Sequence, residues 1–296
     1  MKKIGFVGLG DMGMGMAKNL LNAKYEVTGF DLNETRLGNF AKAGGKAAKN
    51  NAGVGKESDV VFVMVLNADQ AKSVVFGENG LVETMKPGSC IINTATIGIK
   101  GIQDIEKQLK EKKIDLIDAA VSGGQSGANA GTLTMMVSSS KKVFDDCLDV
   151  LNVVGKDIYH VGTEIGLGQV VKSCMQALVG CTYAATFEML ALGAKAGVNP
   201  EILLNVIGTS VVGSTLFKNT TSLIMDRKFT DTGANSAVTY KDLGLTLDLA
   251  KEYGVPMITT SVAHEIFRAG ITKSPGEDNQ CVVKVLEDIL GIEIKK

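Results

Sequence analysis

The chain begins with an apolar strand that leads directly into a glycine-rich turn and a helix. The run Ile4–Val7 precedes Gly8-x-Gly10-x-x-Gly13, and a helical stretch over 14–21 follows. In dinucleotide-binding folds, the first glycine permits the tight turn, the second lets a pyrophosphate approach the backbone, and the third allows close helix–strand packing. The helix N-terminus adds free N–H groups and a positive dipole end. The pattern predicts a cofactor site formed by Gly8, Gly10, Asp11, Met12 and Gly13.

An acidic residue follows the second apolar run. Asp31 ends the run 25–30 and lies 18 residues after Gly13, where a carboxylate is expected to meet the ribose 2′-hydroxyl of NAD. The same carboxylate would repel the 2′-phosphate of NADP, although the nearby Arg36 could weaken that preference. We expect NAD as cofactor, with NADP possible; the alternative is an ordinary turn followed by an exposed acid.

Composition narrows the class of protein. The 296 residues are 45% hydrophobic with a formal net charge of −1, which favours neither nucleic acid nor a membrane surface as partner. We expect no bilayer-spanning run and no secretory core at the N-terminus. Five scattered cysteines indicate a reduced, cytoplasmic protein without a disulfide framework or metal site. Cys174 and Cys181 share a helix face and are expected to be buried rather than redox-active.

Strand and helix patterns alternate over the first part of the chain. This alternation predicts a mostly parallel, doubly wound sheet with helices on both faces. The run 132–137 has glycine-rich and serine-rich flanks and is expected to pair less regularly, and a strand near 157–160 could close the sheet. Helices are expected at 67–76 and 102–111, and strands at 4–7, 26–30, 59–65, 89–93, 114–118 and 132–137.

The pattern becomes entirely helical after residue 168. Apolar residues at helical spacing predict one helix over about 169–196, apolar over a wide arc and therefore buried between domains or subunits. Further helices are expected at 200–208, 215–227, 240–253, 259–269 and 277–290. We therefore predict an α/β Rossmann-type domain over 1–163 and an all-α domain over 164–296 for substrate binding and oligomerisation, as a homodimer or homotetramer.

Two further segments could carry chemistry. Asp118–Gly127 follows the apolar run 114–117, and its small residues could expose N–H groups that bind a carboxylate, with Ser122 as an added donor; a flexible loop is the alternative. Lys172 is expected in the first turn of the long helix among apolar neighbours, where burial and the helix dipole would lower its pKa toward the range of a proton-transfer group. The alternative is a surface lysine whose stem lies on apolar neighbours.

Four segments together resemble the β-hydroxyacid dehydrogenases, or 3-hydroxyisobutyrate dehydrogenase-related family. They are similar to the family's cofactor signature (5–19), substrate signature (118–132), catalytic signature (166–176) and KDLGLA-type segment (240–245). The resemblance covers nearly the whole chain and implies a 6-phosphogluconate dehydrogenase-like helical domain. The segment 275–284 is similar to members that act on threonate, tartronate semialdehyde or 2-(hydroxymethyl)glutarate.

The resemblance also implies a role for each matched residue. Lys172 is the general acid/base, and Ser122, Gly123 and Gly124 hold the substrate carboxylate. The residues implied in cofactor binding beyond the turn are Leu66, Asn67, Thr96 and Lys241, and those implied near the substrate are Met175, Gln176 and again Lys241.

The chain departs from the family pattern at positions that bear on substrate choice. Ala120 replaces a proline of the substrate signature, with an expected loss of loop stiffness. Met175 replaces an asparagine, while Gln176 keeps an amide at the next position, and Thr215 stands where a tryptophan is common. Asp278 is expected either to enter the pocket or to order the C-terminal helices. His160 and His264 are expected to be structural.

The main prediction is an NAD-dependent oxidoreductase that interconverts a small β-hydroxy carboxylate and its semialdehyde or ketone. An imine reductase-like enzyme is one alternative, although such enzymes carry a different proton donor at the position of Lys172 and lack the glycine-rich loop. A non-catalytic dinucleotide-binding module is the other. The sequence leaves open the substrate, the direction and the strictness for NAD.

Overall fold

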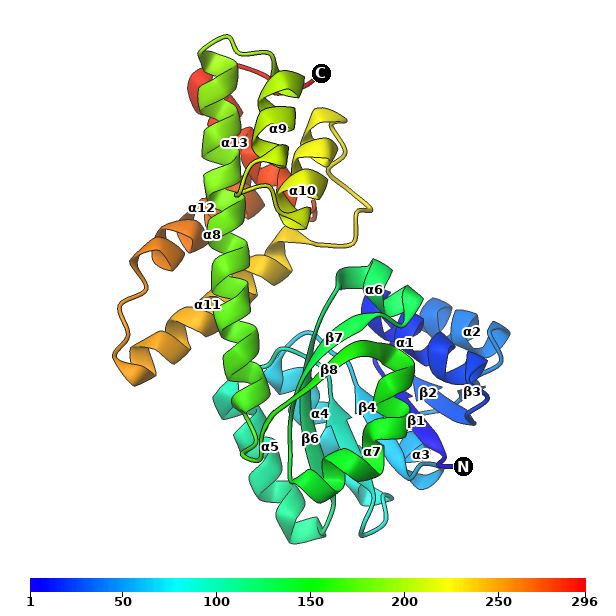
Figure 1. The fold of residues 1–296 in the computed structure, drawn as a ribbon. Coiled ribbons are helices and arrows are strands. Elements are labelled where there is room, and N and C mark those ends of the chain that lie inside the picture. The colour runs from blue at the N-terminus through cyan, green and yellow to red at the C-terminus, as the bar shows by residue number, and fades with distance from the viewer. The chain divides into compact units, whose positions relative to one another are not determined.

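One eight-stranded sheet organises the first part of the chain (Figure 1). The computed structural model describes residues 1–296, which form two units, Met1–Lys172 and Ser173–Lys296. The order across the sheet is β3-β2-β1-β4-β5-β6-β7-β8. Neighbouring strands are parallel except β6 and β7. The strands are β1 (Ile4–Val7), β2 (Val27–Phe30), β3 (Lys46–Ala47), β4 (Val60–Val63), β5 (Cys90–Asn93), β6 (Asp115–Ser122), β7 (Leu133–Ser138) and β8 (Gly155–Gly162).

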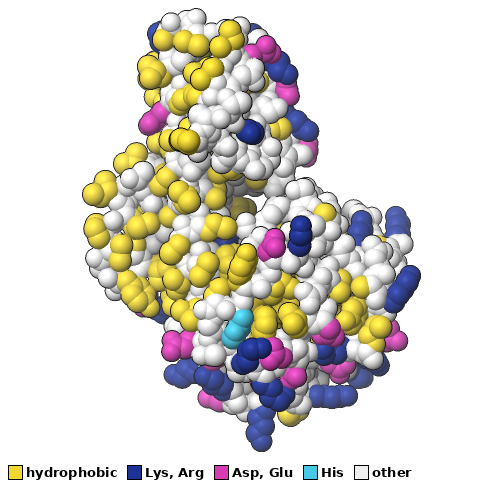
Figure 2. Space-filling view, in the orientation of Figure 1, with side chains coloured by type: hydrophobic (Ala, Val, Ile, Leu, Met, Phe, Trp, Pro, Cys, Tyr) yellow, Lys and Arg dark blue, Asp and Glu magenta, His cyan; other side chains and the backbone are white.

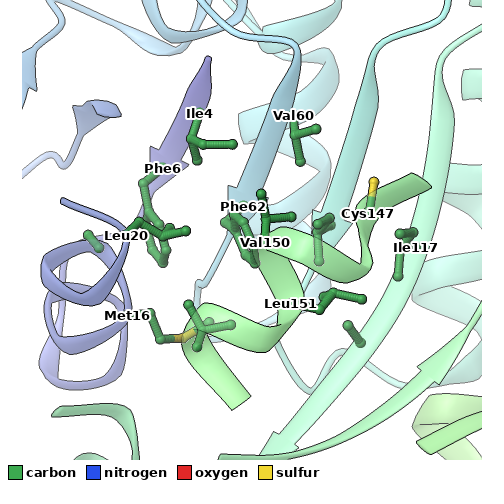
Figure 3. Packing of buried hydrophobic residues seen from close by; sticks show 14 of the residues in the cluster. Ile4, Phe6, Met16, Leu20, Val60, Phe62, Ile117, Cys147, Val150 and Leu151 are labelled. Carbon is green, nitrogen blue, oxygen red and sulfur yellow. The ribbon is translucent and has the colours of Figure 1, made fainter. Parts of the chain in front are cut away.

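The central strands are mostly apolar because helices cover both faces of the sheet. Every residue of β1, β4 and β5 is buried. One face packs mainly on α1 (Asp11–Asn22) and α7 (Lys141–Val154), as Figure 3 shows around the parallel stack of the Phe6 and Phe62 rings. The other packs on α3 (Asn51–Lys56), α4 (Ala68–Phe76) and α5 (Ile99–Lys112). The predicted doubly wound α/β fold is therefore confirmed.

Two strands, β3 and β6, differ most from the sequence-based prediction. β3 has only two residues, both exposed, and therefore lacks the apolar run that marks a strand. β6 extends four residues beyond the predicted end at 118, because Ala119, Ala120 and Val121 are buried and pair with β7. The run 132–137 is the antiparallel strand β7, in keeping with its irregular flanks, and β8 lies at the edge of the sheet.

The second unit is helical, as predicted. Its first element, α8 (Leu167–Lys195), begins inside the first unit, because the two units meet between Lys172 and Ser173; the sequence analysis placed the boundary before this helix. The expected helix over 277–290 is split into a 3₁₀ turn, η2 (Asn279–Val282), and α13. The other helices are α9 (Pro200–Thr209), α10 (Thr215–Met225), α11 (Ser236–Tyr253), α12 (Ile258–Lys273) and α13 (Val283–Leu290).

Two expectations about α8 are wrong. The helix is long and apolar enough to span a bilayer by length and composition, contrary to the expectation that no such segment exists; half of its most apolar stretch is buried inside the protein, and a core helix passes the same test. Cys174 is exposed and Cys181 is only half-buried, because the helix carries apolar residues on its solvent side as well, among them Leu178 and Leu192.

Apolar side chains cover much of the surface of the second unit (Figure 2). Between α12 and α13 lies a groove of about 510 Å³, which we call the α12–α13 groove. Its lining is mainly apolar and also includes Glu188 of α8, Ser261 and Glu265. The groove includes Val262 and Ile289, which are 55% and 72% exposed. A monomeric protein rarely exposes a large continuous apolar patch, so this surface is a candidate contact area.

Candidate active site

The parallel strands end together at one edge of the sheet. The strand order reverses between β1 and β4, and ligands of open α/β sheets bind outside the carboxyl ends of the strands at such a point. β1 ends in the glycine turn, β2 in Asp31, and β4 in the segment that carries Leu66 and Asn67. β5 and β6 end before Thr96 and at Ser122. The structure thus brings the predicted residues of the first domain to one edge of the sheet.

The three glycines of the turn differ in their surroundings. Gly8 has a φ of +91°, and a Cβ on it would lie 2.1 Å from the carbonyl oxygen of Met64. A Cβ on Gly13 would lie 1.9 Å from the carbonyl oxygen of Gly8. At Gly10 the nearest atom to a Cβ is Nη1 of Arg36, at 3.6 Å. Gly8 and Gly13 are therefore required by packing, whereas the open face at Gly10 suits a ligand pressed against the backbone.

The helix that follows the turn can bind a phosphate. α1 begins at Asp11, with Gly10 as its N-cap and no side chain capping it. The N–H groups of Asp11 and Met12 precede the first i→i−4 bond, which Met14 donates to the carbonyl of Gly10. These groups and the helix dipole fit the pyrophosphate of a dinucleotide.

Asp31 is held in place by the main chain. Its Oδ2 accepts a hydrogen bond from the N–H of Leu9 at 2.7 Å, and its Oδ1 accepts one from the N–H of Asn33 at 2.8 Å. Each carboxylate oxygen can accept a further bond, so Asp31 can still receive a ribose hydroxyl. The side chain of Arg36 also lies beside this turn, because its Nη1 is 3.6 Å from where a Cβ on Gly10 would be. An acid and a base therefore both border the region where the ribose of a dinucleotide is expected.

Asn67 and Leu66 form the start of α4. The Oδ1 of Asn67 accepts a hydrogen bond from the N–H of Gln70 at 2.9 Å, which caps the helix, and Oε1 of Gln70 accepts one from the N–H of Leu66 at 2.9 Å. The Leu66 side chain is 61% exposed. The sequence analysis did not foresee that Asn67 is a helix cap.

The glycine-rich segment after β6 is a turn into a short helix rather than a loop. Gly123 and Gly124 have φ values of +131° and +60°, which L side chains adopt with strain, and α6 (Gly124–Ala130) begins immediately. α6 packs on α1, where Nδ2 of Asn19 donates to the carbonyl of Ala128 at 2.8 Å. Ala120 lies within β6, paired with Met136, so its replacement of a proline changes a buried strand position and not loop stiffness.

Lys172 is buried, as the sequence analysis expected, with 8% of its surface exposed. Because α8 begins at Leu167, Lys172 is its sixth residue and lies beyond the first turn. The effect of the helix dipole falls off within that turn, so the predicted dipole contribution is weaker than expected. Burial, rather than the helix end, distinguishes this lysine from those on the surface.

A buried hydrogen-bond network lies one turn before Lys172. The Nε2 of Gln169 donates to Oδ1 of Asp118 at 2.6 Å and to the carbonyl of Ala95 at 3.2 Å. The Oε1 of Gln169 accepts from the N–H groups of Ile97 and Gly98 at 2.9 and 3.1 Å. The sequence analysis missed the roles of Asp118 and Gln169, because a contact across 51 residues leaves no local signal.

Burial controls the protonation of Asp118. Its side chain is inaccessible to solvent, and loss of hydration raises the pKa of Asp118 to about 6, against the opposing effect of hydrogen bonds from Gln169, Ser138 and Gly166. Asp118 is therefore mainly ionised at neutral pH and accepts hydrogen bonds at both oxygens.

The second unit holds its own polar cluster. Nε2 of Gln176 donates to Oδ2 of Asp242 at 2.7 Å, and Nζ of Lys241 lies 2.9 Å from Oδ1 of Asp242. Gln176 and Asp242 are both buried. The structure thus groups the two predicted residues Gln176 and Lys241, and adds Asp242, which the sequence analysis quoted within its motif without assigning it a role.

The remaining candidates have simpler roles. Met175 is half-buried and Thr215 is exposed. Asp278 takes the structural alternative: its Oδ2 accepts bonds from the N–H and hydroxyl of Thr232 at 2.6 and 2.7 Å. His160 contacts the carbonyl of Ser139 at 2.8 Å, and His264 stacks on Tyr240, consistent with structural roles.

Fold and site together define a two-domain nicotinamide-dependent dehydrogenase. Residues 3–162 match the model of the NAD-binding domain of 6-phosphogluconate dehydrogenase, and 166–286 match the model described as NAD-binding of NADP-dependent 3-hydroxyisobutyrate dehydrogenase. The chain belongs to the 3-hydroxyisobutyrate dehydrogenase-related family of β-hydroxyacid dehydrogenases.

Relatives match over almost their whole length. A 2-(hydroxymethyl)glutarate dehydrogenase of Eubacterium barkeri is 40% identical over 99% of this chain and 97% of its own. An L-threonate dehydrogenase of Cupriavidus necator is 36% identical over 99% and 98%. The crystal structure of a 3-hydroxyisobutyrate dehydrogenase from Salmonella typhimurium has a TM-score of 0.88 at 33% identity, covering 96% of this chain and 99% of its own.

An imine reductase shares the fold at greater distance. The enzyme from Myxococcus stipitatus, solved with NADP⁺, has a TM-score of 0.67 at 20% identity, covering 96% of this chain and 99% of its own. At that identity the likeness is one of fold alone. The hydroxyacid dehydrogenases are therefore the nearer relatives.

The position of Asp31 predicts cofactor preference. Asp31→Asn removes the charge that repels a 2′-phosphate and leaves Arg36 in place, so the ratio of kcat/KM for NAD to that for NADP should fall at least ~10-fold, the equivalent of about 1.4 kcal/mol. Both cofactors are assayed on the same variant, so damage to the turn affects both alike. Glu34→Gln, which removes an exposed carboxylate three residues later, is the control. An unchanged ratio in Asp31→Asn would show that the carboxylate does not select the cofactor.

The raised pKa of Asp118 predicts a pH-dependent contribution to stability. Its pKa is about 6 in the folded protein and about 3.9 in an unfolded chain. The proton is thus bound more tightly in the folded state, so this contribution is complete below pH about 4 and is lost as the pH rises through about 6.

Asp118→Asn lacks this contribution. Relative to wild type, the variant should lose about 1 kcal/mol more of unfolding free energy at pH 5 than at pH 8, measured by urea denaturation. Asp115→Asn, at the exposed start of the same strand, controls for loss of a carboxylate. An equal loss from Asp118→Asn at both pH values would contradict the raised pKa.

Proposed function

We propose that the protein oxidises a small β-hydroxy carboxylate with NAD, or reduces the corresponding semialdehyde or ketone. One observation carries the proposal. The buried Lys172 lies one helical turn after Gln169, which is hydrogen-bonded to the loop that carries Thr96 and to the strand that ends in Ser122. A candidate proton-transfer group is thereby fixed to a candidate cofactor loop and a candidate carboxylate-binding turn.

Each part of the first domain has a distinct task in the proposed reaction. The turn from Gly8 to Gly13 and Asp31 bind and orient the dinucleotide, whose nicotinamide ring supplies the hydride acceptor or donor. The hydroxyl of Ser122 and the backbone N–H groups of Gly123 and Gly124 bind the substrate carboxylate. The Nζ of Lys172 accepts the proton of the substrate hydroxyl during oxidation and returns it to the carbonyl oxygen during reduction.

The substrate class follows from the relatives. Threonate and 2-(hydroxymethyl)glutarate, which the relatives' names give as substrates, are small carboxylates with hydroxyl groups, and we extend this class to the present chain. Met175 and Thr215, where the chain departs from the family pattern, are the positions at which we expect the substrate's remaining groups to be distinguished. The assignments of Gln176 and Lys241 to substrate and cofactor remain predictions.

The two alternative functions predict different behaviour. An imine reductase-like enzyme would reduce an imine and would not depend on Lys172 or on the turn at Gly123. A non-catalytic module would bind the dinucleotide without consuming it. The combination of a buried lysine and a glycine-rich turn at the end of β6 favours the hydroxyacid dehydrogenase.

Substitution of Lys172 tests the proposed acid/base. Lys172→Ala should lower kcat at least ~100-fold, the usual contribution of a general acid/base, while the Kd for NAD, set mainly by the turn at Gly8–Gly13, should change less than about twofold. The measurement is NADH absorbance with a panel of β-hydroxy acids and both cofactors. Lys107→Ala, on the exposed side of α5, is the control. Near-wild-type turnover in Lys172→Ala would refute the assignment.

We also propose that the α12–α13 groove pairs with a second copy of the chain. Its apolar lining is costly to leave in water, and isologous pairing buries the same surface on both partners. Light scattering should give a mass of at least twice the 31.1 kDa of one chain. Val262→Asp with Ile289→Asp should reduce that mass, whereas Leu32→Asp, on the exposed surface of the first domain, should not. A monomeric wild-type protein would contradict this proposal.

A further inference from the structure

The side-chain amide of Gln169 has only one orientation that satisfies its surroundings. Its Oε1 accepts from two main-chain N–H groups, those of Ile97 and Gly98, and its Nε2 donates to the carbonyl of Ala95 and to Asp118. A flipped amide would place N–H against N–H and oxygen against oxygen. Gln169 is 1% exposed, so water cannot replace these bonds. The amide therefore hydrogen-bonds to the main chain on both sides of Thr96.

Asp118 fixes the other end of the network. Its Oδ2 accepts from the N–H of Gln169 at 3.1 Å and from the hydroxyl of Ser138 at 3.2 Å, and the same hydroxyl accepts from the N–H of Gly168 at 3.2 Å. A Cβ on Gly168 would lie 2.6 Å from the carbonyl oxygen of Met136 and 2.8 Å from Oδ2 of Asp118. The first turn of α8 is thus attached directly to β6 and β7.

Three candidate functional groups share this attachment. Lys172 is three residues after Gln169 and therefore lies on the same face of α8. Thr96 lies within the segment to which Gln169 is hydrogen-bonded, and Ser122 ends the strand that contains Asp118. Bonds to Gln169 and Asp118 therefore set the positions from which all three groups act.

We propose that Asp118 and Gln169 are positioning residues for hydride transfer. Their hydrogen bonds hold Lys172 at a fixed position relative to the Thr96 loop and the carboxylate-binding turn. The inference rests on the proposed function and extends it to two residues that are buried away from solvent. A small displacement of a proton-transfer group lowers the rate of the chemical step strongly while binding is nearly kept. The expected signature is a loss of kcat without a matching loss of cofactor affinity.

The donor and acceptor pattern makes two near-isosteric variants informative. In Asp118→Asn, the new amide must place a donor against either the N–H or the Nε2 of Gln169. In Gln169→Glu, the new oxygen faces both Asp118 and the carbonyl of Ala95. In the double variant, Nδ2 of Asn at 118 can donate to the carboxylate at 169, which restores the central bond with its polarity reversed and leaves only the carbonyl of Ala95 without its donor.

The experiment measures kcat, KM and the Kd for NAD in the full-length single and double variants, with folding checked by circular dichroism. Each single variant should lose at least ~10-fold in kcat and less than about threefold in Kd. The kcat of the double variant should be no lower than the kcat of the less active single variant, because the two residues act as one unit. Asp115→Asn and Gln108→Glu, on exposed positions of β6 and α5, should keep wild-type kcat.

Two results would overturn the inference. One is a folded Asp118→Asn or Gln169→Glu variant whose kcat is within twofold of wild type. The other is a double variant whose loss equals the product of the single losses, which is expected of independent residues that merely stabilise the fold. Gln169→Glu keeps the test valid if Asp118→Asn does not fold.

A separate readout distinguishes failure of the inference from failure of the proposed function. If wild-type protein oxidises no hydroxy acid in the panel, the proposed function fails, and hydrogen exchange then tests the structural premise of the inference, the attachment of the Thr96 loop and α8 through Gln169. The N–H groups of Ile97, Gly98 and Gln169 should exchange faster in Asp118→Asn or Gln169→Glu than in Asp115→Asn. Unchanged protection would overturn the inference whatever the enzyme's substrate.

Discussion

The parallel direction of five neighbouring strands is the constraint on which the active site depends. β2, β1, β4, β5 and β6 all run the same way, so their carboxyl ends meet at one edge. Residues that are far apart in the sequence, from Gly8 to Ser122, reach that edge because each follows its own strand. The buried apolar runs that hold the strands together carry no chemistry themselves, yet they set where every functional residue of the domain lies.

The antiparallel strand β7 provides the attachment point of α8. It supplies Ser138 and the backbone against which Gly168 packs, so the return of the chain after the turn at Gly123 creates the place where α8 is attached. A fully parallel sheet would have required a crossover helix at this point. The single reversal in the sheet is therefore what lets the lysine-bearing helix begin beside the strand that ends in Ser122.

Local patterns predicted the fold and part of the site. The glycine turn, Asp31 and the alternation of strands and helices are visible in short windows, because each depends on residues close in sequence. The network of Asp118 and Gln169 and the pair of Gln176 and Asp242 join residues 51 and 66 positions apart, and no periodicity encodes such contacts. The burial of Ala119–Val121 in β6 was also missed, because small residues beside glycines resemble a loop until their partner strand is known.

The glycines of the cofactor turn differ in how freely evolution could replace them. Gly8 and Gly13 are crowded by carbonyl oxygens of the main chain, and no substitution elsewhere can make a main-chain atom smaller. A mutation at either position thus has no simple second-site compensation, and descendants of this sequence should keep both glycines whatever they bind. Gly10 faces no such obstacle within the protein, so a lineage that abandoned the dinucleotide would be free to replace this glycine first.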